Sequence, residues 1–197
     1  MRGLLLAAVL AVAMPLSASA QNVEVAGVKY ESAAEVGGSK LLLNGAGIRY
    51  KAFFKVYTAG LYLNAKAGSS DAVLGNNGPK RIHIQMLREI DGNELGKLFT
   101  KGMEENSTRD EFAKAISGVL RIADIFSTKK RLSSGENFSI EWVPGQGTLV
   151  YVNGKLQGEP IKEPEFYTVL LKIWLGRSPA DEQLKDALLG VKRERNR

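Results

Sequence analysis

The residues of this chain that could take part in chemistry are few, and the most prominent of them is Arg49. It stands between two glycines, Gly45 and Gly47, and an aromatic-rich run that contains Tyr57. A planar guanidinium binds carboxylates or phenolates through paired hydrogen bonds, and a tyrosine hydroxyl can donate to the same anion. Two interpretations stay open. Arg49 is either a solvated hairpin residue, as most arginines are exposed, or an anion clamp at the mouth of an apolar pocket.

The other chemistry-bearing residue types are scarce. The sequence has one histidine, His83, and no cysteine, which excludes disulfides, cysteine nucleophiles and the usual zinc ligand set. His83 lies inside an alternating strand pattern, which favours a structural role over a place in a Ser-His-Asp triad. No helix pattern follows Gly45-Ala-Gly47, so these glycines predict a tight turn between strands and no nucleotide site. We expect no cofactor and no metal.

The first residues of the 197-residue chain have the pattern of an export signal. Arg2 precedes a short apolar run that ends near Met14, and Ala18-Ser-Ala20 forms a cleavage site. We therefore predict a signal peptide over residues 1–20, with an uncleaved anchor as the alternative, and a mature protein that is periplasmic or secreted. After cleavage we expect no transmembrane segment. We do not expect a lipoprotein, because the chain has no cysteine to acylate.

The chain carries a formal net charge of +6, and much of the excess lies near its end. We predict one domain over residues 21–190 and a basic C-terminal tail over 191–197. A solvated tail is the simplest interpretation of this charge, and binding to an anionic membrane surface is the alternative. For an exported chain we expect no nucleic-acid partner, and the sequence indicates no particular protein partner.

Strand patterns fall in two groups. The first contains residues 40–43, the run from Phe53 to Leu63 and the alternating run 80–88. Both faces of the run 53–63 are apolar, which predicts a central strand covered on both sides. The second group contains the runs 138–143 and 148–152, followed by a hairpin turn at Asn153-Gly154.

Helical patterns fill the remaining segments. The spacing of apolar residues predicts a helix over 93–105 and another after the capping box that begins at Thr108. The second helix should bury one face, made of Phe112, Ile116, Val119, Leu120 and Ala123. Two more helices are predicted near the end, one around 166–174 and one capped by Ser178 with Pro179 at its first position. This order of elements indicates an α+β fold with a large antiparallel sheet and helices on one face.

Several motifs together resemble one known family. They are Asn44-Gly-Ala-Gly-Ile-Arg49, the run Phe54 to Leu63, Trp142-Val-Pro-Gly-Gln-Gly-Thr148, and the ending from Ile173-Trp-Leu-Gly-Arg177 to Gly190. The sequence resembles the chalcone isomerase-like family, in particular its bacterial exported branch. This resemblance implies an open-faced β-sandwich, in which a large antiparallel sheet and a helical layer enclose a ligand cleft.

The family contains plant enzymes that cyclise chalcones, plastid proteins that bind fatty acids without catalysis, and a branch that assists flavonoid synthesis without isomerising. Arg49 matches the family arginine that contacts the substrate or the fatty-acid carboxylate, and Lys97 matches the enzymes' active-site lysine. Tyr57 falls where the enzymes have threonine and the fatty-acid binders have tyrosine. Three polar residues of the enzymes fall on apolar ones here, at Phe112, Val119 and Ile173.

These departures favour binding over cyclisation, because apolar side chains cannot supply the hydrogen bonds of a cyclisation site. The leading hypothesis is a non-catalytic exported protein that binds a fatty acid or a similar amphipathic carboxylate in an apolar cleft. Its ligand would contact Arg49, Tyr57, Phe112, Val119 and Ile173. One alternative is an intramolecular lyase or isomerase that acts on a chalcone-like or other enone substrate through Arg49 and Lys97. Another is an envelope structural or interaction protein without a small ligand.

Overall fold

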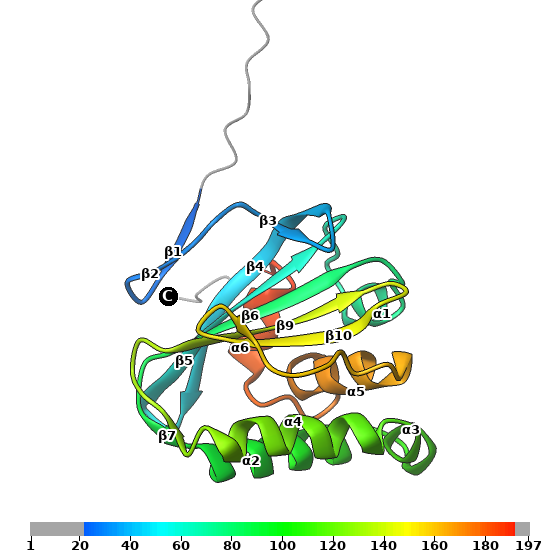
Figure 1. The fold of residues 1–197 in the computed structure, drawn as a ribbon. Helices are drawn as coiled ribbons and strands as arrows, with labels where there is room; N and C mark the ends of the chain where they lie inside the picture. Colours follow the sequence, from blue (N-terminus) through cyan, green and yellow to red (C-terminus); the bar gives the residue numbers. More distant parts are fainter. Residues whose placement is uncertain (1–21, 192–197) are drawn as a thin grey trace, which may run out of the picture.

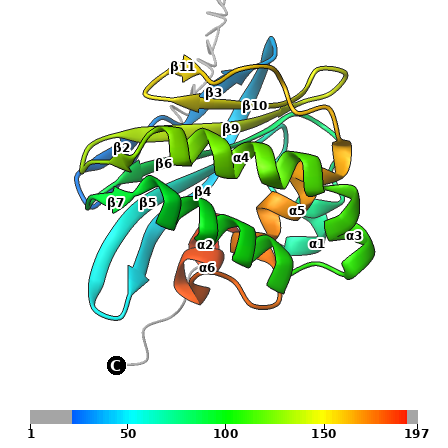
Figure 2. The ribbon, with the colours of Figure 1, turned by 60° about the horizontal axis from the view of Figure 1, so that its bottom comes forward.

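The computed structural model describes residues 22–191, and its central element is a large antiparallel sheet. In chain order the strands of this sheet are β3 (Ala33–Val36), β4 (Ser39–Lys51), β5 (Phe54–Leu63), β6 (Lys80–Met86), β9 (Asn137–Val143), β10 (Gly147–Val152) and β11 (Lys155–Leu156). In space they form one seven-stranded sheet in the order β11-β10-β9-β6-β5-β4-β3 (Figures 1 and 2). Two further sheets have two strands each. One pairs β1 (Val23–Val25) with β2 (Val28–Tyr30), and the other pairs β7 (Ile90–Asp91) with β8 (Arg131–Leu132).

The helices gather against one face of this sheet (Figures 1 and 2). They are α1 (Ser70–Leu74), α2 (Gly92–Glu105), α3 (Arg109–Lys114), α4 (Ile116–Thr128), α5 (Pro164–Leu175) and α6 (Glu182–Leu188). The β1–β2 hairpin lies on the opposite side of the sheet from α2 and α4 (Figure 1). The predicted α+β class, with a large antiparallel sheet and a helical layer, is therefore confirmed.

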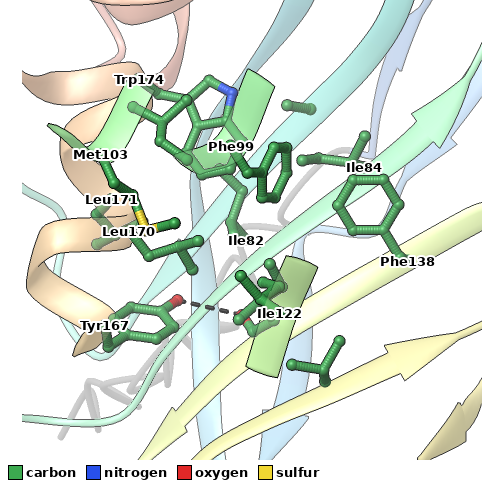
Figure 3. Packing of buried hydrophobic residues seen from close by; sticks show 14 of the residues in the cluster. Ile82, Ile84, Phe99, Met103, Ile122, Phe138, Tyr167, Leu170, Leu171 and Trp174 are labelled. Atoms are coloured by element: carbon green, nitrogen blue, oxygen red, sulfur yellow. Dashed lines mark hydrogen bonds between the residues drawn. The ribbon is translucent and has the colours of Figure 1, made fainter. Parts of the chain in front are cut away.

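The sheet separates two hydrophobic clusters. The larger cluster lies under the helices, where the Phe99 and Trp174 rings meet edge to face with centroids 5.6 Å apart (Figure 3). The smaller cluster lies under the β1–β2 hairpin and includes Tyr30 and Tyr62. Strand β5 contributes Leu61 to the first cluster and Tyr62 to the second, because successive side chains of a strand point to opposite faces. The prediction that this strand is covered on both sides is confirmed.

The predicted turn at Gly45 and Gly47 is wrong, because both glycines lie inside the long strand β4. A Cβ on Gly45 would stand 2.0 Å from the Ala187 carbonyl oxygen, and one on Gly47 would stand 2.5 Å from the Ala187 Cβ. The glycines therefore allow α6 to pack directly on the strand. The reversal between β4 and β5 occurs later, at Ala52, whose φ of 55° is in the left-handed region.

The single long helix predicted after Thr108 is also wrong, although its beginning is confirmed. Thr108 and Glu111 form the capping box, with reciprocal hydrogen bonds of 3.2 and 2.9 Å. The helix then breaks at Ala115 into α3 and α4, and the break turns later side chains away from the predicted apolar face. As a result Ile116 is 40% exposed and Leu120 is 64% exposed.

The last helix begins later than the sequence pattern predicts. Ser178 and Pro179 precede it, and its N-cap is Asp181, whose Oδ1 accepts a hydrogen bond of 2.7 Å from the Gln183 amide. The other carboxylate oxygen of Asp181 accepts from the Tyr50 backbone amide at 2.8 Å. One carboxylate thus caps α6 and also ties it to the β4 strand.

The remaining predictions concern the late hairpin and the two ends of the chain. Asn153 and Gly154, with φ of 49° and 74°, form the predicted turn between β10 and β11. The predicted signal peptide lies outside the described residues, as does the basic tail beyond residue 191. Between residues 22 and 191, no helix has the length and apolar character needed to cross a membrane.

Candidate functional site

A cavity of about 410 Å³ lies where β4 and β5 face α2. Pockets that hold small molecules typically have volumes of about 300–1,000 Å³ and mostly apolar walls with a few polar groups. The apolar side chains of this lining are Phe54, Val56, Ile90, Leu95, Leu98, Phe99, Ile173, Pro179 and Ala180. Its charged and hydroxyl-bearing side chains include Arg49, Lys51, Tyr57, Arg88, Glu89, Glu94, Lys101 and Glu105.

Arg49 and Tyr57 are brought together by the register of the hairpin. They are direct cross-strand partners on β4 and β5, so their side chains extend from the same face of the sheet. The Arg49 Cζ atom lies 6.0 Å from the centroid of the Tyr57 ring, within the range of a cation–π contact. One guanidinium nitrogen donates to the Tyr50 carbonyl oxygen at 3.0 Å. That bond fixes one edge of the guanidinium and leaves its other donors available.

The charge of Arg49 has no carboxylate partner within ion-pair distance in the part of the chain that the structure describes. In contrast, each acidic side chain of the cavity lining forms an ion pair with a lysine or arginine. The pairs are Glu89 with Arg131 at 3.8 Å, Glu94 with Lys51 at 3.9 Å, and Glu105 with Lys101 at 3.6 Å. A partly buried cation without a counter-ion attracts an anionic group from solution.

Tyr57 presents a protonated hydroxyl to this environment. Burial raises the pKa of Tyr57 to about 12, although the positive charge of Arg49 and the hydrogen bond from Trp174 act in the opposite direction. The Trp174 Nε1–H donates to the Tyr57 hydroxyl oxygen at 2.8 Å. Among the described residues the Tyr57 proton itself has no acceptor. The hydroxyl is therefore oriented by one hydrogen bond and can still donate another.

Arg88 is a second cation of the cavity that the sequence analysis did not identify. Its guanidinium lies 4.2 Å from the centroid of the Phe54 ring, and within residues 22–191 it forms no ion pair. The sequence did place Arg88 at the end of the alternating run 80–88, whose first seven residues form β6. The strand pairing sets Met86 opposite Tyr57, which carries the following residues toward the cavity.

The structure gathers only some of the predicted site residues. Arg49, Tyr57 and Ile173 line the same cavity. Phe112 lines a separate hollow beside α3, and Val119 is 1% exposed inside the core. Of the three apolar positions that distinguish the sequence from the cyclising enzymes, Ile173 alone therefore bears on the polarity of this cavity.

Lys97 also lies away from the cavity, in a shallow hollow on the other side of α2. The geometry of the helix explains this, because residues two apart point in nearly opposite directions. Leu95 and Phe99 face the sheet from α2 and line the cavity, and Lys97 stands between them. The isomerase hypothesis therefore retains one of its two named residues, Arg49, at this cavity.

His83 lies on the other face of the sheet, next to Tyr30 and Ser139. Its Nδ1 is 3.0 Å from the Ser139 hydroxyl, and its ring centroid is 6.0 Å from that of Tyr30. Burial and the charge of Arg81 lower the pKa of His83 to about 4. A histidine in this position cannot reach the cavity. Across the described residues, no group of three or more histidine or acidic side chains is placed to hold a metal ion.

Comparison with known proteins gives a family match and a structural match. A family model described as chalcone isomerase-like matches residues 22–190. The crystal structure of a fatty-acid-binding protein of Arabidopsis thaliana superposes with a TM-score of 0.63 and 15% sequence identity, over 86% of this chain and 96% of that chain. At this identity the likeness concerns the fold. No curated protein matches the sequence.

Proposed function

The chain belongs to the chalcone isomerase-like family, and we propose that it is a non-catalytic binding protein for a fatty acid or a similar amphipathic carboxylate. The ligand occupies the cavity between α2 and the β4–β5 end of the sheet. Its carboxylate lies at Arg49 and Tyr57, and its acyl chain lies against the apolar wall. We further propose that residues 1–20 export the protein as a member of a bacterial exported branch and are then removed.

The observation that carries this proposal is the pairing of Arg49 with Tyr57. Within residues 22–191, the Arg49 guanidinium has no counter-ion and the Tyr57 hydroxyl proton has no acceptor, and the two groups stand side by side at a cavity. A carboxylate has two oxygens, so it can accept from both groups at once. Buried donors that lack acceptors cost free energy, so a bound carboxylate would stabilise both side chains.

The apolar part of the cavity lining suits the acyl chain of the proposed ligand. Part of the cavity lining consists of side chains that cannot form hydrogen bonds, among them Val56 from β5, Leu95 and Phe99 from α2, and Ile173 from α5. Burial of methylene groups against such side chains contributes about 0.8 kcal/mol for each group. The Arabidopsis thaliana protein that shares the fold is named as a fatty-acid binder, which agrees with this division into a polar and an apolar end.

Native mass spectrometry of the protein purified from its own cells tests the proposal. We expect a bound species that is released on denaturation and has the mass of a long-chain carboxylic acid, together with an N-terminus near Gln21. Protein that carries no ligand and also fails to bind added palmitate would overturn the binding function and favour an interaction role. An N-terminus at Met1 would overturn only the proposed export.

The isomerase alternative has its own test. Arg49 could polarise a substrate oxygen, but Lys97 lies on the far side of α2 from the cavity. We therefore expect chalcone to cyclise at its uncatalysed rate in the presence of the protein. Turnover clearly above that rate, lost in the Arg49→Met variant, would replace the binding proposal with an enzymatic one.

A further inference from the structure

The turn between β4 and β5 projects beyond the neighbouring elements, at the lower left of Figure 2. We define residues 51–55 of this turn as the hairpin tip. Phe53 at its end is 79% exposed and the adjacent Phe54 is 45% exposed, with ring centroids 4.1 Å apart. Lys51 pairs with Phe54 across the turn, so only Ala52 and Phe53 form the reversal. A tight turn thus holds two aromatic rings together in solvent.

The surroundings of these rings are positively charged. Lys51 and Lys55 flank them along the chain, and the Arg88 guanidinium covers the Phe54 ring at 4.2 Å. Acidic groups of the adjoining cavity lining include Glu94, 3.9 Å from Lys51, and Glu89, which pairs with Arg131 at 3.8 Å. The cations around the tip therefore outnumber the carboxylates that face them.

An exposed apolar tip surrounded by cations is complementary to the surface of an anionic bilayer. Negatively charged headgroups attract clustered lysine and arginine, and the interfacial region accepts aromatic rings. A single such signal gives weak binding, and two acting together give stable binding. A second copy of the chain is a poorer match. Two phenylalanine rings supply at most about 500 Å² of contact, and a specific protein interface needs about 800 Å² on each partner.

The hairpin tip is continuous with the cavity. Lys51, Phe54 and Arg88 belong to the tip or contact it, and all three also line the cavity. We propose that the tip docks the protein on anionic phospholipid membranes, with Phe53 and Phe54 inserted among the lipids and Lys51, Lys55 and Arg88 at the headgroups. Docking would set the mouth of the cavity against the bilayer. The passage of a fatty acid from bilayer to cavity rests on the proposed function, whereas the docking itself does not.

Vesicle flotation tests the docking, with a chain of residues 21–197, which contains both core clusters. We expect binding to vesicles of phosphatidylglycerol and phosphatidylcholine, weaker binding to phosphatidylcholine alone, and loss of the difference at high salt. Phe53→Ser removes an inserted ring and should lower the partition coefficient by about tenfold. Lys55→Glu reverses a headgroup charge and should lower it by about tenfold or more on anionic vesicles. Neither residue lines the cavity.

Two matched controls locate the effect. Leu120→Ser removes another exposed apolar side chain, on α4, and Lys155→Glu reverses a charge on the edge strand β11. Both should bind anionic vesicles as the unchanged protein does. The proposal is overturned if the unchanged protein does not bind these vesicles, or if the controls lose as much binding as Phe53→Ser. Palmitate binding in vesicle-free solution, measured on the same samples, reports separately on the proposed function.

Discussion

The arginines on the two faces of the sheet differ in their polar partners. On the hairpin-covered face the Arg81 Nε lies 3.4 Å from a Glu141 carboxylate oxygen, and an Arg81 terminal nitrogen donates to the Ser139 hydroxyl at 2.9 Å. On the helical face Arg49 contacts a ring and one carbonyl oxygen, and no carboxylate among the described residues pairs with it. The first arginine links neighbouring strands, and the second has the donors that the proposed ligand would use.

The tyrosines repeat this contrast. Under the hairpin the Tyr30 hydroxyl donates to the Thr58 hydroxyl at 2.8 Å, so its proton is used inside the protein. Under the helices the Tyr57 hydroxyl accepts from Trp174, and its proton has no acceptor in the described part of the chain. A cavity lies beside Tyr57. Under the proposed function, the covered face contributes stability and the helical face contributes the binding site.

The strongest test of this division is Tyr30→Ala. Tyr30 is 1% exposed, and its ring lies so close to Gly60 that a Cβ there would stand 2.4 Å from it. Truncation should lower the free energy of unfolding by about 3–5 kcal/mol, as for other buried aromatic residues. Urea unfolding measures this loss. Below the unfolding transition the affinity for palmitate should stay unchanged, and a parallel loss of affinity would show that the two faces are not separable.

The pH dependence of stability gives a second test of the covered face. His83 has a pKa of about 4 in the folded chain, against an ordinary value of 6.5, through burial and the charge of Arg81. Below pH 6.5 the unfolded chain takes up a proton that the folded chain resists. Stability present above that pH is therefore lost as the pH falls toward 4.

His83→Gln keeps a polar group near Ser139 and removes this titration. Between neutral pH and the folded pKa of about 4, the unchanged protein should lose about 3 kcal/mol more stability than the variant does. Urea unfolding at several pH values measures the difference. The buried Glu141 nearby has a pKa raised by burial, and it remains in both proteins as an internal reference. Identical pH profiles would contradict the assignment of His83 as a buried neutral side chain.

Tyr57→Phe should produce the smallest of these effects. Loss of one hydrogen bond to the carboxylate should weaken palmitate binding by about 1 kcal/mol, close to fivefold. Isothermal titration calorimetry measures it. Tyr62→Phe is the matched control, because Tyr62 lies on the same strand and belongs to the cluster under the β1–β2 hairpin. Equal effects of the two substitutions would mean that the Tyr57 hydroxyl has no special role in binding.

Much of the fold follows from local sequence patterns. The alternation in β6, the capping box at Thr108 and the Asn153-Gly154 turn each depend on neighbours within a few residues. The glycines of β4 could not be interpreted in that way. Glycine is needed at these positions because Ala187, about 140 residues further along the chain, packs against them. No local pattern shows whether a glycine serves a turn or a packed strand.

The sequence likewise predicted some residues of the candidate site and missed others. Arg49 and Tyr57 were identified together, and strand pairing does set them opposite each other. Arg88 was missed because its role arises from the pairing of β6 with β5, which composition does not show. Resemblance alone assigned Lys97 to the isomerase alternative and Val119 to the ligand. The rotation of α2 and the packing of α4 place them outside the cavity.

The most direct test of the central claim is a comparison of two ligands in two proteins. Palmitate and cetyl alcohol have saturated chains with the same number of carbon atoms and differ in the charge of the head group. The unchanged protein should prefer palmitate, and Arg49→Met should weaken palmitate binding about tenfold to a hundredfold while cetyl alcohol binds as before. Arg81→Met should keep the preference for palmitate and lose stability instead. Unchanged palmitate affinity in Arg49→Met would contradict the account.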